Sequence, residues 1–251
     1  MSENVPKARV NKFGYSSIIR EFVVVLFTAF LLWLSAGLQF WLNAWIYIIW
    51  LLVFSAVFMV AMARWNPSLL NLRGAPRREM KTRPMPSYEK VFFTGFVLLM
   101  LLIPIIAGLE FNGFFSTFPF PGFFFAIVEM PIWLVVLGFV FIVLGEILFG
   151  WAMVVNPFFH GMMTIQDDRE HQVVSKGPYR WIRHPGYLGQ ILLYLGTPLL
   201  LASWWALLFG LTMALVFLYR TMKEDGALRN DLAGYHEYAE EVRKRLIPRI
   251  W

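Results

Sequence analysis

The sequence predicts an all-α protein that spans a membrane about six times, as a helix bundle with both termini in the cytoplasm. Of its 251 residues, 59% are hydrophobic and only 15% are charged, whereas about a quarter of a soluble domain is charged. Residues 22–63 contain no Asp, Glu, Lys or Arg. Cysteine is absent, which excludes disulfides, zinc–thiolate sites and a cysteine nucleophile.

The first half of the chain predicts three spans. Residues 22–63 have room for two, because one span needs about 20 residues, and the turn between them is expected at 39–43, among tryptophans suited to the headgroup level. Residues 64–90 are polar and interrupted by Gly and Pro, which predicts a loop. The third span is expected at 91–109. Residues 111–125 hold eight Phe among Gly and Pro and predict an interfacial loop.

The second half predicts a fourth span and a helical hairpin. Residues 131–155 form the fourth span, and the polar connection 156–185 is long enough to be a functional candidate. The apolar stretch 184–219 predicts two short helices hinged near Ser203. Beyond Arg220 the chain is amphipathic, with an interruption at Gly234. We therefore expect a membrane region at 1–155 for access of a substrate and a catalytic region at 156–251.

The positions of the basic residues support this topology. With six spans, all 22 Lys and Arg fall on one side of the membrane, in residues 7–20, 64–90, 169–183 and 220–249. The positive-inside rule then places the N-terminus in the cytoplasm. The excess of positive charge is explained by this topology and by contact with membrane lipids, without nucleic acid. A prokaryotic plasma membrane and the endoplasmic reticulum both fit, and the oligomeric state stays open.

Polar residues that could take part in a reaction are concentrated in 166–187 and at the cytoplasmic end of the last predicted span. A hairpin returns His184 and Arg220 to the same membrane face. Arg220 and Glu224 are four residues apart and share one helix face, whereas Asp225 is rotated away from it. We therefore expect Arg220 and Glu224 to act as a pair.

The same residues resemble a known family. Residues 177–189, GPYRWIRHPGYLG, are followed after the hairpin by Arg220, Glu224 and Asp225 and then by tyrosines 235 and 238. This two-part pattern resembles the isoprenylcysteine carboxyl methyltransferase family and, more widely, the phospholipid methyltransferases. The resemblance covers about the last third of the chain. It implies an integral membrane methyltransferase that uses S-adenosylmethionine (SAM) and a lipophilic or lipidated acceptor.

The resemblance also implies roles for individual residues. Arg220 resembles the arginine that contacts the acceptor, and with Glu224 it forms the catalytic candidate pair. The positions that resemble the SAM contacts of the family are Gln166, His171, Gln172, Val173, Val174, Tyr179, His184, Pro185, Gly186, Tyr187 and Glu224. Gly186 stands where the eukaryotic prenylcysteine enzymes carry Ser, which leaves the acceptor open. Asp225 stands where the family has a second Glu, and we expect it to matter less than Glu224.

The residue types suit methyl transfer independently of the resemblance. SAM carries its own leaving group, so the protein needs positioning and exclusion of water rather than a metal or a covalent nucleophile. A guanidinium at the membrane boundary can hold a carboxylate acceptor through two hydrogen bonds. The acceptor therefore stays open between a prenylcysteine carboxylate, a phospholipid amine, and a small thiol or amine.

Two other functions compete with methyl transfer. An NADPH-dependent sterol-type reductase would share an RHP-containing hairpin, but such enzymes carry further Cys positions and this chain has none. A transporter or scaffold would place ionisable residues near the membrane midplane. Glu146, inside the fourth predicted span, is the one such residue, and its partner is not evident from the sequence.

Overall fold

The computed structural model describes residues 9–76, 87–117, 129–159 and 171–247. Within these ranges every regular element is a helix, so the predicted all-α fold is confirmed. The α-helices are α1 (Lys12–Ser35), α2 (Leu42–Trp65), α3 (Pro67–Gly74), α4 (Ser87–Phe111), α5 (Ile132–Val155), α6 (Pro185–Leu200), α7 (Trp204–Asp231) and α8 (Tyr235–Glu241). Two short 3-10 helices, η2 (Phe114–Thr117) and η5 (Gly177–Arg180), lie between them.

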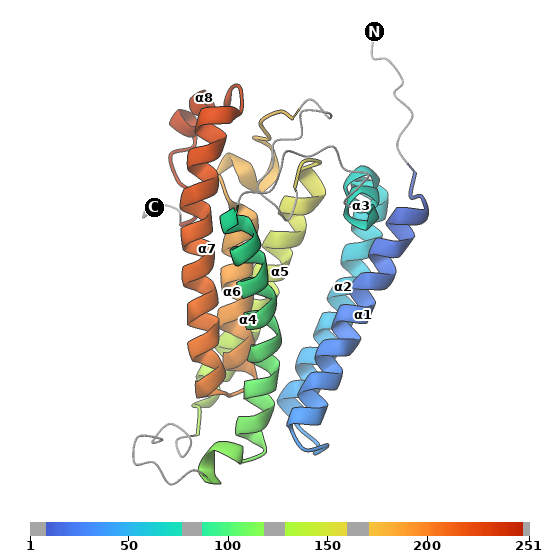
Figure 1. Ribbon diagram of the computed structural model, residues 1–251, viewed down its shortest axis with the longest axis vertical. Helices are drawn as coiled ribbons and strands as arrows, with labels where there is room; N and C mark the ends of the chain where they lie inside the picture. The colour runs from blue at the N-terminus through green and yellow to red at the C-terminus, as the bar shows by residue number, and fades with distance from the viewer. Residues whose placement is uncertain (1–8, 77–86, 118–128, 160–170, 248–251) are drawn as a thin grey trace.

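Helices α1, α2, α4, α5, α6 and α7 run along the long axis of the molecule (Figure 1). Within the described ranges, α1, α2, α4, α5 and α7 are long and apolar enough to cross a membrane. Helix α6 has 16 residues, about 24 Å at 1.5 Å per residue, which is shorter than the roughly 30 Å hydrocarbon core. It joins α7 through residues 201–203, where the Ser203 side chain caps α7. The predicted hairpin with its hinge near Ser203 is thus confirmed.

Helix α3 corrects the sequence prediction, because it lies inside the segment expected to be a loop. Asn66 is its N-cap and accepts a hydrogen bond from the Leu69 amide, and Pro67 occupies the first helical turn. This Asn-Pro pair favours a helix start as well as a turn. Leu69 and Leu70 are fully buried, so packing of this one short helix decides between the two interpretations.

Helix α1 also differs from prediction, since it begins at Lys12 rather than near residue 22. The Asn11 side chain accepts from the amides of Phe13 and Gly14 and so starts the helix early. The charge-free stretch marked the apolar part of this helix and not its beginning. The other expected boundaries agree with α2, α4 and α5 to within a few residues.

Helices α5 and α6 pack through paired glycines. A Cβ atom on Gly189 would lie 2.6 Å from the Gly145 carbonyl oxygen, and one on Gly196 would lie 2.6 Å from that of Gly138. On each helix the two glycines are seven residues apart, two turns on the same face. Small residues let membrane helices approach closely where burial of apolar surface drives little association. This close pair positions the start of α6, which carries part of the predicted site.

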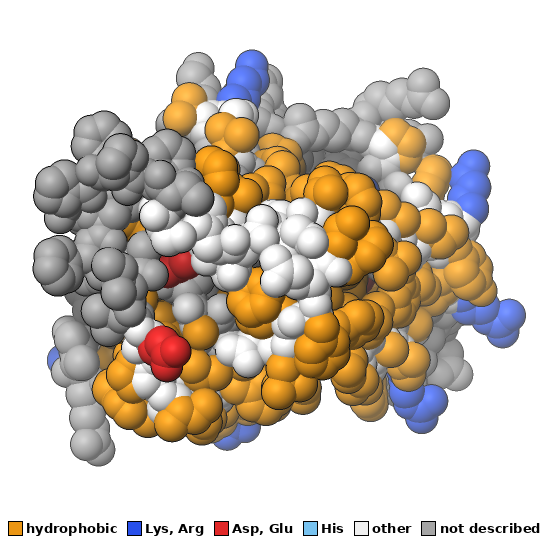
Figure 2. All heavy atoms as spheres, turned by 90° about the horizontal axis from the view of Figure 1, so that it is seen from below, with side chains coloured by type: hydrophobic (Ala, Val, Ile, Leu, Met, Phe, Trp, Pro, Cys, Tyr) orange, Lys and Arg blue, Asp and Glu red, His pale blue; other side chains and the backbone are white. Residues whose placement is uncertain are grey.

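The molecule is apolar outside and ends in two chemically different faces. Large hydrophobic side chains of α1, α2 and α5 are exposed, as expected for a surface in contact with lipid. The end opposite α8 is covered mostly by hydrophobic and uncharged atoms (Figure 2). The described connections at that end, residues 36–41, 112–116 and 201–203, contain no Lys or Arg. α3, η5 and α8 lie at the other end (Figure 1), so the basic segments gather on one side as predicted.

Candidate functional site

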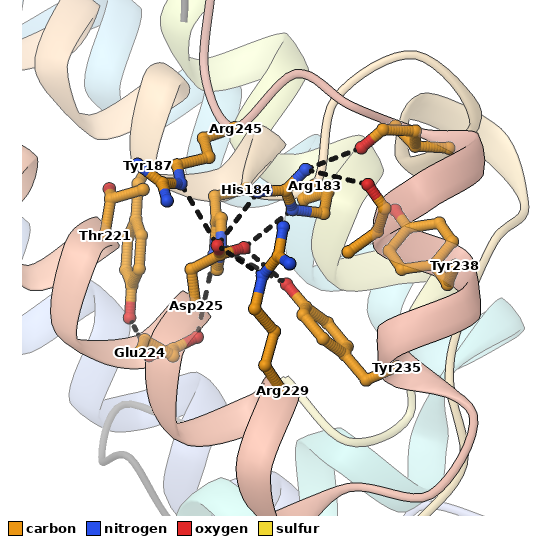
Figure 3. Close-up of polar contacts among 12 residues, drawn as sticks. Arg183, His184, Tyr187, Thr221, Glu224, Asp225, Arg229, Tyr235, Tyr238 and Arg245 are labelled. Carbon is orange, nitrogen blue, oxygen red and sulfur yellow. Dashed lines mark hydrogen bonds and ion pairs between the residues drawn. The ribbon is translucent and has the colours of Figure 1, made fainter.

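The candidate site lies where the hairpin α6–α7 ends at the basic face of the bundle. The start of α6, the last two turns of α7, and α8 with the segment after it meet there (Figure 3). The backbone amides of Arg183 and His184 donate to the carbonyls of Lys244 and Arg245, each at 2.9 Å. The start of α6 and a segment 61 residues further along the chain are therefore joined directly.

Asp225 is the centre of this junction. Its carboxylate accepts two hydrogen bonds from the Arg183 guanidinium, at 2.6 and 2.9 Å, and one from the Tyr235 hydroxyl at 3.0 Å. His184 Nε2 lies 3.2 Å from the same carboxylate. The guanidiniums of Arg229 and Arg245 approach from the outside, at 3.3 and 3.1 Å. Figure 3 shows these side chains converging on Asp225.

This arrangement corrects the expectation that Asp225 matters less than Glu224. Asp225 does point away from the Arg220 face, as predicted, but it points into the protein, where its side chain is 1% exposed. Breaking a buried pair by removing one partner typically costs roughly 3–5 kcal/mol, because the other charge stays buried. Asp225 thus fixes the position of His184 and of the motif around it.

The electrostatics of the junction keep its donors protonated. Burial, and then the Asp225 carboxylate, raise the pKa of Tyr235 above its ordinary value. Burial alone would lower the pKa of Arg183, but the hydrogen bond and the charge of Asp225 outweigh it and raise the pKa. Both residues therefore remain hydrogen-bond donors to Asp225 at physiological pH.

Beside this junction, His184 and Tyr187 present their rings to one carboxylate. The two rings are parallel within 6°, with centroids 5.7 Å apart. Glu224 accepts a short hydrogen bond from the Tyr187 hydroxyl, and its other oxygen lies 3.9 Å from His184 Nδ1. The Glu224 side chain is 23% exposed, in contrast to the buried Asp225. A partly accessible carboxylate of this kind suits a cationic ligand.

Arg220 completes this group and contacts a residue that sequence reasoning missed. Its Nε donates to the Tyr187 hydroxyl at 2.8 Å and lies 4.0 Å from Glu224, so the predicted pair is confirmed. Its NH1 lies 3.1 Å from the carboxylate of Glu89 on α4. The guanidinium also sits over the Phe92 ring, 3.9 Å from its centroid. Glu89 is far away in sequence and belongs to no visible motif, so its role could not be found from the pattern.

The connection before α6 brings the other predicted residues to the neighbouring end of α5. The His171 ring stacks on Phe158 with centroids 4.5 Å apart. The hydroxyl of Tyr179 accepts from Asn156 at 3.1 Å, and its carbonyl accepts from the Tyr238 hydroxyl at 2.6 Å. Burial raises the pKa of Tyr179, so its hydroxyl stays neutral.

The remaining predicted residues fall into three environments. Val173 packs against the apolar cluster of α8, Gln172 is exposed, and Val174 is partly buried. Pro185 and Gly186 are buried in the first turn of α6, and a Cβ atom on Gly186 would meet the Phe159 ring at 2.5 Å. Gln166 lies outside the described residues.

Glu146 has a partner after all. The Trp50 indole of α2 donates a short hydrogen bond to its carboxylate, and Glu146 is 4% exposed. This contact links α2 to α5 on the lipid-embedded side of the site. Glu146, whose partner was not evident from the sequence, is therefore paired with an indole and not with a charged group.

The sequence of the region that builds this junction has relatives. Residues 135–230 match the profile of the Isoprenylcysteine carboxyl methyltransferase (ICMT) family. This segment is less than half of the chain, and over it the protein is similar to the ICMT family. The matched range covers α6, nearly all of α5 and α7, and the residues Arg220, Glu224 and Asp225. Glu89 and the Asp225 partners Tyr235 and Arg245 lie outside it.

Several known proteins are similar to this chain. The protein-S-isoprenylcysteine O-methyltransferase of Schizosaccharomyces pombe is 27% identical over 156 residues, 61% of this chain and 65% of that protein. A probable protein-S-isoprenylcysteine O-methyltransferase of Oryza sativa subsp. indica is 31% identical over 113 residues, 43% and 59% of the two chains. The lamin-B receptor of Drosophila melanogaster is 31% identical over 102 residues, 38% and 14%. The chain thus spans less than two thirds of each relative's length.

Proposed function

We propose that this protein is an integral membrane methyltransferase that transfers a methyl group from SAM to a lipophilic acceptor. The observation that carries the proposal is the group formed by His184, Tyr187, Arg220 and Glu224 at the basic end of the bundle. The ICMT family match over the same segment supports it. Residues 156–251 then form the catalytic region, and residues 1–155 form the path by which the acceptor arrives from the membrane.

The residues present fit SAM as a methyl donor. Bound SAM supplies an electrophilic methyl group on a sulfonium, and its amino group and sulfonium are both cationic. Glu224 is partly exposed beside the Tyr187 hydroxyl and His184 Nδ1, and it binds and orients a cation by charge and hydrogen bonding. Asp225 holds His184 in place from behind. Positioning and exclusion of water are the main tasks left to the protein.

The names of the relatives in Schizosaccharomyces pombe and Oryza sativa, protein-S-isoprenylcysteine O-methyltransferases, suggest the carboxylate of a prenylcysteine as one acceptor class, and the surroundings of Arg220 described below decide between it and the other class. A phospholipid amine or a small thiol or amine is the alternative class. An NADPH-dependent reductase is the remaining candidate from the sequence pattern.

The first experiment is calorimetric binding of SAM and S-adenosylhomocysteine to the detergent-purified protein. We expect both ligands to bind and Glu224→Ala to weaken binding at least tenfold. Glu240→Ala is the matched control, since it removes a carboxylate that is 70% exposed on α8, and it should bind like the parent. No binding of either ligand, together with oxidation of NADPH on addition of a sterol, would replace this proposal with the reductase.

A further inference from the structure

The guanidinium of Arg220 already has a carboxylate bound to it. Glu89 of α4 lies 3.1 Å from its NH1, and the two side chains are 2% and 3% exposed. Glu89 is 2% exposed as a residue and is one of the most deeply buried large side chains of the chain. Glu89 thus occupies the NH1 side of the Arg220 guanidinium, where another carboxylate could otherwise form an ion pair.

The surroundings strengthen this ion pair. Phe92 lies under the guanidinium, with its ring centroid 3.9 Å from Arg220 Cζ, and Phe217 packs edge to face against Phe92 and Phe96. An apolar environment strengthens a charge pair and makes an unpaired charge costly. Arg220 is therefore held by Glu89 more firmly than a pair at the surface would be.

The charges around Arg220 disfavour a further anion. Glu89 at 3.1 Å and Glu224 at 4.0 Å place two carboxylates on one guanidinium. An acceptor carboxylate would be a third, and it would have to displace Glu89 from a buried position to reach NH1. A neutral acceptor meets neither obstacle.

We propose that Glu89 is an acceptor-specificity residue that disfavours a carboxylate beside Arg220 and favours a neutral thiol or amine. This inference rests on the proposed methyltransferase function and deepens it. In the reaction the methyl carbon–sulfur bond of SAM breaks as a bond from that carbon to the acceptor sulfur or nitrogen forms. S-Adenosylhomocysteine leaves, and the acceptor's proton passes to water through Glu224, the more exposed of the two carboxylates.

The test compares three acceptors with one farnesyl chain: farnesyl thiol, farnesylamine and farnesoic acid. Transfer of labelled methyl from SAM is measured for the parent and for Glu89→Gln. We expect the parent to prefer the thiol or amine, and Glu89→Gln to raise the ratio of kcat/KM for the acid to that for the thiol at least tenfold. An unchanged or lower ratio in Glu89→Gln would overturn the proposal.

Glu110→Gln is the matched control. It removes a carboxylate from the other end of α4, where Glu110 accepts from the amides of Trp204 and Trp205, and it should leave the acid-to-thiol ratio at the parent value. If Glu89→Gln fails to fold, Glu89→Asp serves in its place, with a smaller shift in the same direction. In an Arg220→Gln background the shift should vanish, because Glu89 acts through Arg220.

Binding separates failure of this inference from failure of the proposed function. The three compounds are also titrated calorimetrically in the presence of S-adenosylhomocysteine, which gives the same preference without turnover. If S-adenosylhomocysteine binds but Glu89→Gln leaves the relative affinity for the acid unchanged, only the role of Glu89 is rejected. Absence of S-adenosylhomocysteine binding would reject the methyltransferase itself.

Discussion

At the scale of single residues, one aspartate connects the parts of the site. Asp225 receives Arg183, His184 and Tyr235 on its buried side and two more arginines on its outer side. Since it joins α6, α7 and the segment after α8, its charge stabilises both the fold and the position of His184. A carboxamide in its place keeps the shape and removes the charge.

We therefore expect Asp225→Asn to lower the free energy of unfolding by roughly 3–5 kcal/mol, because the buried Arg183 loses its counter-ion. SAM should bind at least tenfold more weakly, since His184 loses its partner. Tryptophan fluorescence during heating and calorimetry measure the two effects. Asp231→Asn, an exposed aspartate at the end of the same helix, is the control. Equal stability of the two variants would mean that the junction is held by apolar packing alone.

A second residue-scale prediction concerns the hydroxyl of Tyr187, which joins Arg220 to Glu224. Tyr187→Phe keeps the ring beside His184 and removes a hydrogen bond to a charged group, worth roughly 1.5–3 kcal/mol. We expect kcat/KM for methyl transfer to fall about tenfold or more. Tyr194→Phe, two turns further along α6, should keep the parent rate. A similar loss in both variants would assign the effect to packing of α6.

Sequence reasoning found one side of the site and missed the other. Arg220 and Glu224 were predicted as a pair because their four-residue spacing places them on one helix face, whereas His184 and Tyr187 were predicted from the resemblance of their motif. Glu89 was not, because its contact with Arg220 depends on how α4 packs against α7, which no local spacing encodes. Asp225 was underestimated for a similar reason: the helix geometry predicted its direction correctly but not what fills the space there.

At the scale of helices, close packing of α5 on α6 fixes the first turn of α6, where His184 and Tyr187 begin the site. The glycines at 145 and 189 leave no room for a methyl group between the two backbones. The seven-residue spacings, Gly138 to Gly145 and Gly189 to Gly196, were visible in the sequence. Only the structure shows that Gly145 faces Gly189 and that Gly138 faces Gly196.

We expect Gly189→Ala to destabilise the protein, because its Cβ atom would lie 2.6 Å from the Gly145 carbonyl oxygen and 2.8 Å from the Phe149 amide nitrogen. Relief of this overlap moves α6 away from α5, at a cost of roughly 1–3 kcal/mol. Gly95→Ala in α4 is the matched control, since no atom lies within 4 Å of its Cβ position. That variant should gain roughly 0.5–1 kcal/mol from helix propensity. Thermal unfolding of both variants measures the difference, and an equal response would remove the close-packing argument.

Helix boundaries were predictable where the composition changes sharply from polar to apolar. They were not predictable where a capping side chain determines the residue at which the helix begins. The ends of α5 and the hinge of the hairpin follow apolar stretches, and the structure places them there. The start of α1 and the whole of α3 depend on the side chains of Asn11 and Asn66. An asparagine before a helix and an asparagine in a turn look the same in the sequence, and only burial of Leu69 and Leu70 separates them.

At the scale of the whole molecule, the asymmetry of charge predicts how the bundle sits in a membrane. The described connections at the end opposite α8 carry no Lys or Arg, whereas α3, η5 and the segment after α8 are basic. Basic segments stay on the cytoplasmic side. The candidate site lies at the basic end, so methyl transfer is predicted to face the side on which SAM is made.

The chain contains no cysteine, so single cysteines report this orientation without background. Lys176→Cys lies in the exposed connection before η5. It should react with a membrane-impermeant maleimide only after the membrane is permeabilised, so that the reagent reaches the cytoplasmic side. Ser116→Cys, in η2 at the opposite end and also exposed, should react in intact cells or sealed right-side-out vesicles. Both variants should react fully in detergent, which controls for accessibility of the thiol. Labelling of both from the same side would require an even number of crossings between them. Since α5 is the one helix between these positions, among the described residues, that is long and apolar enough to cross a membrane, this result would mean that α5 does not span it.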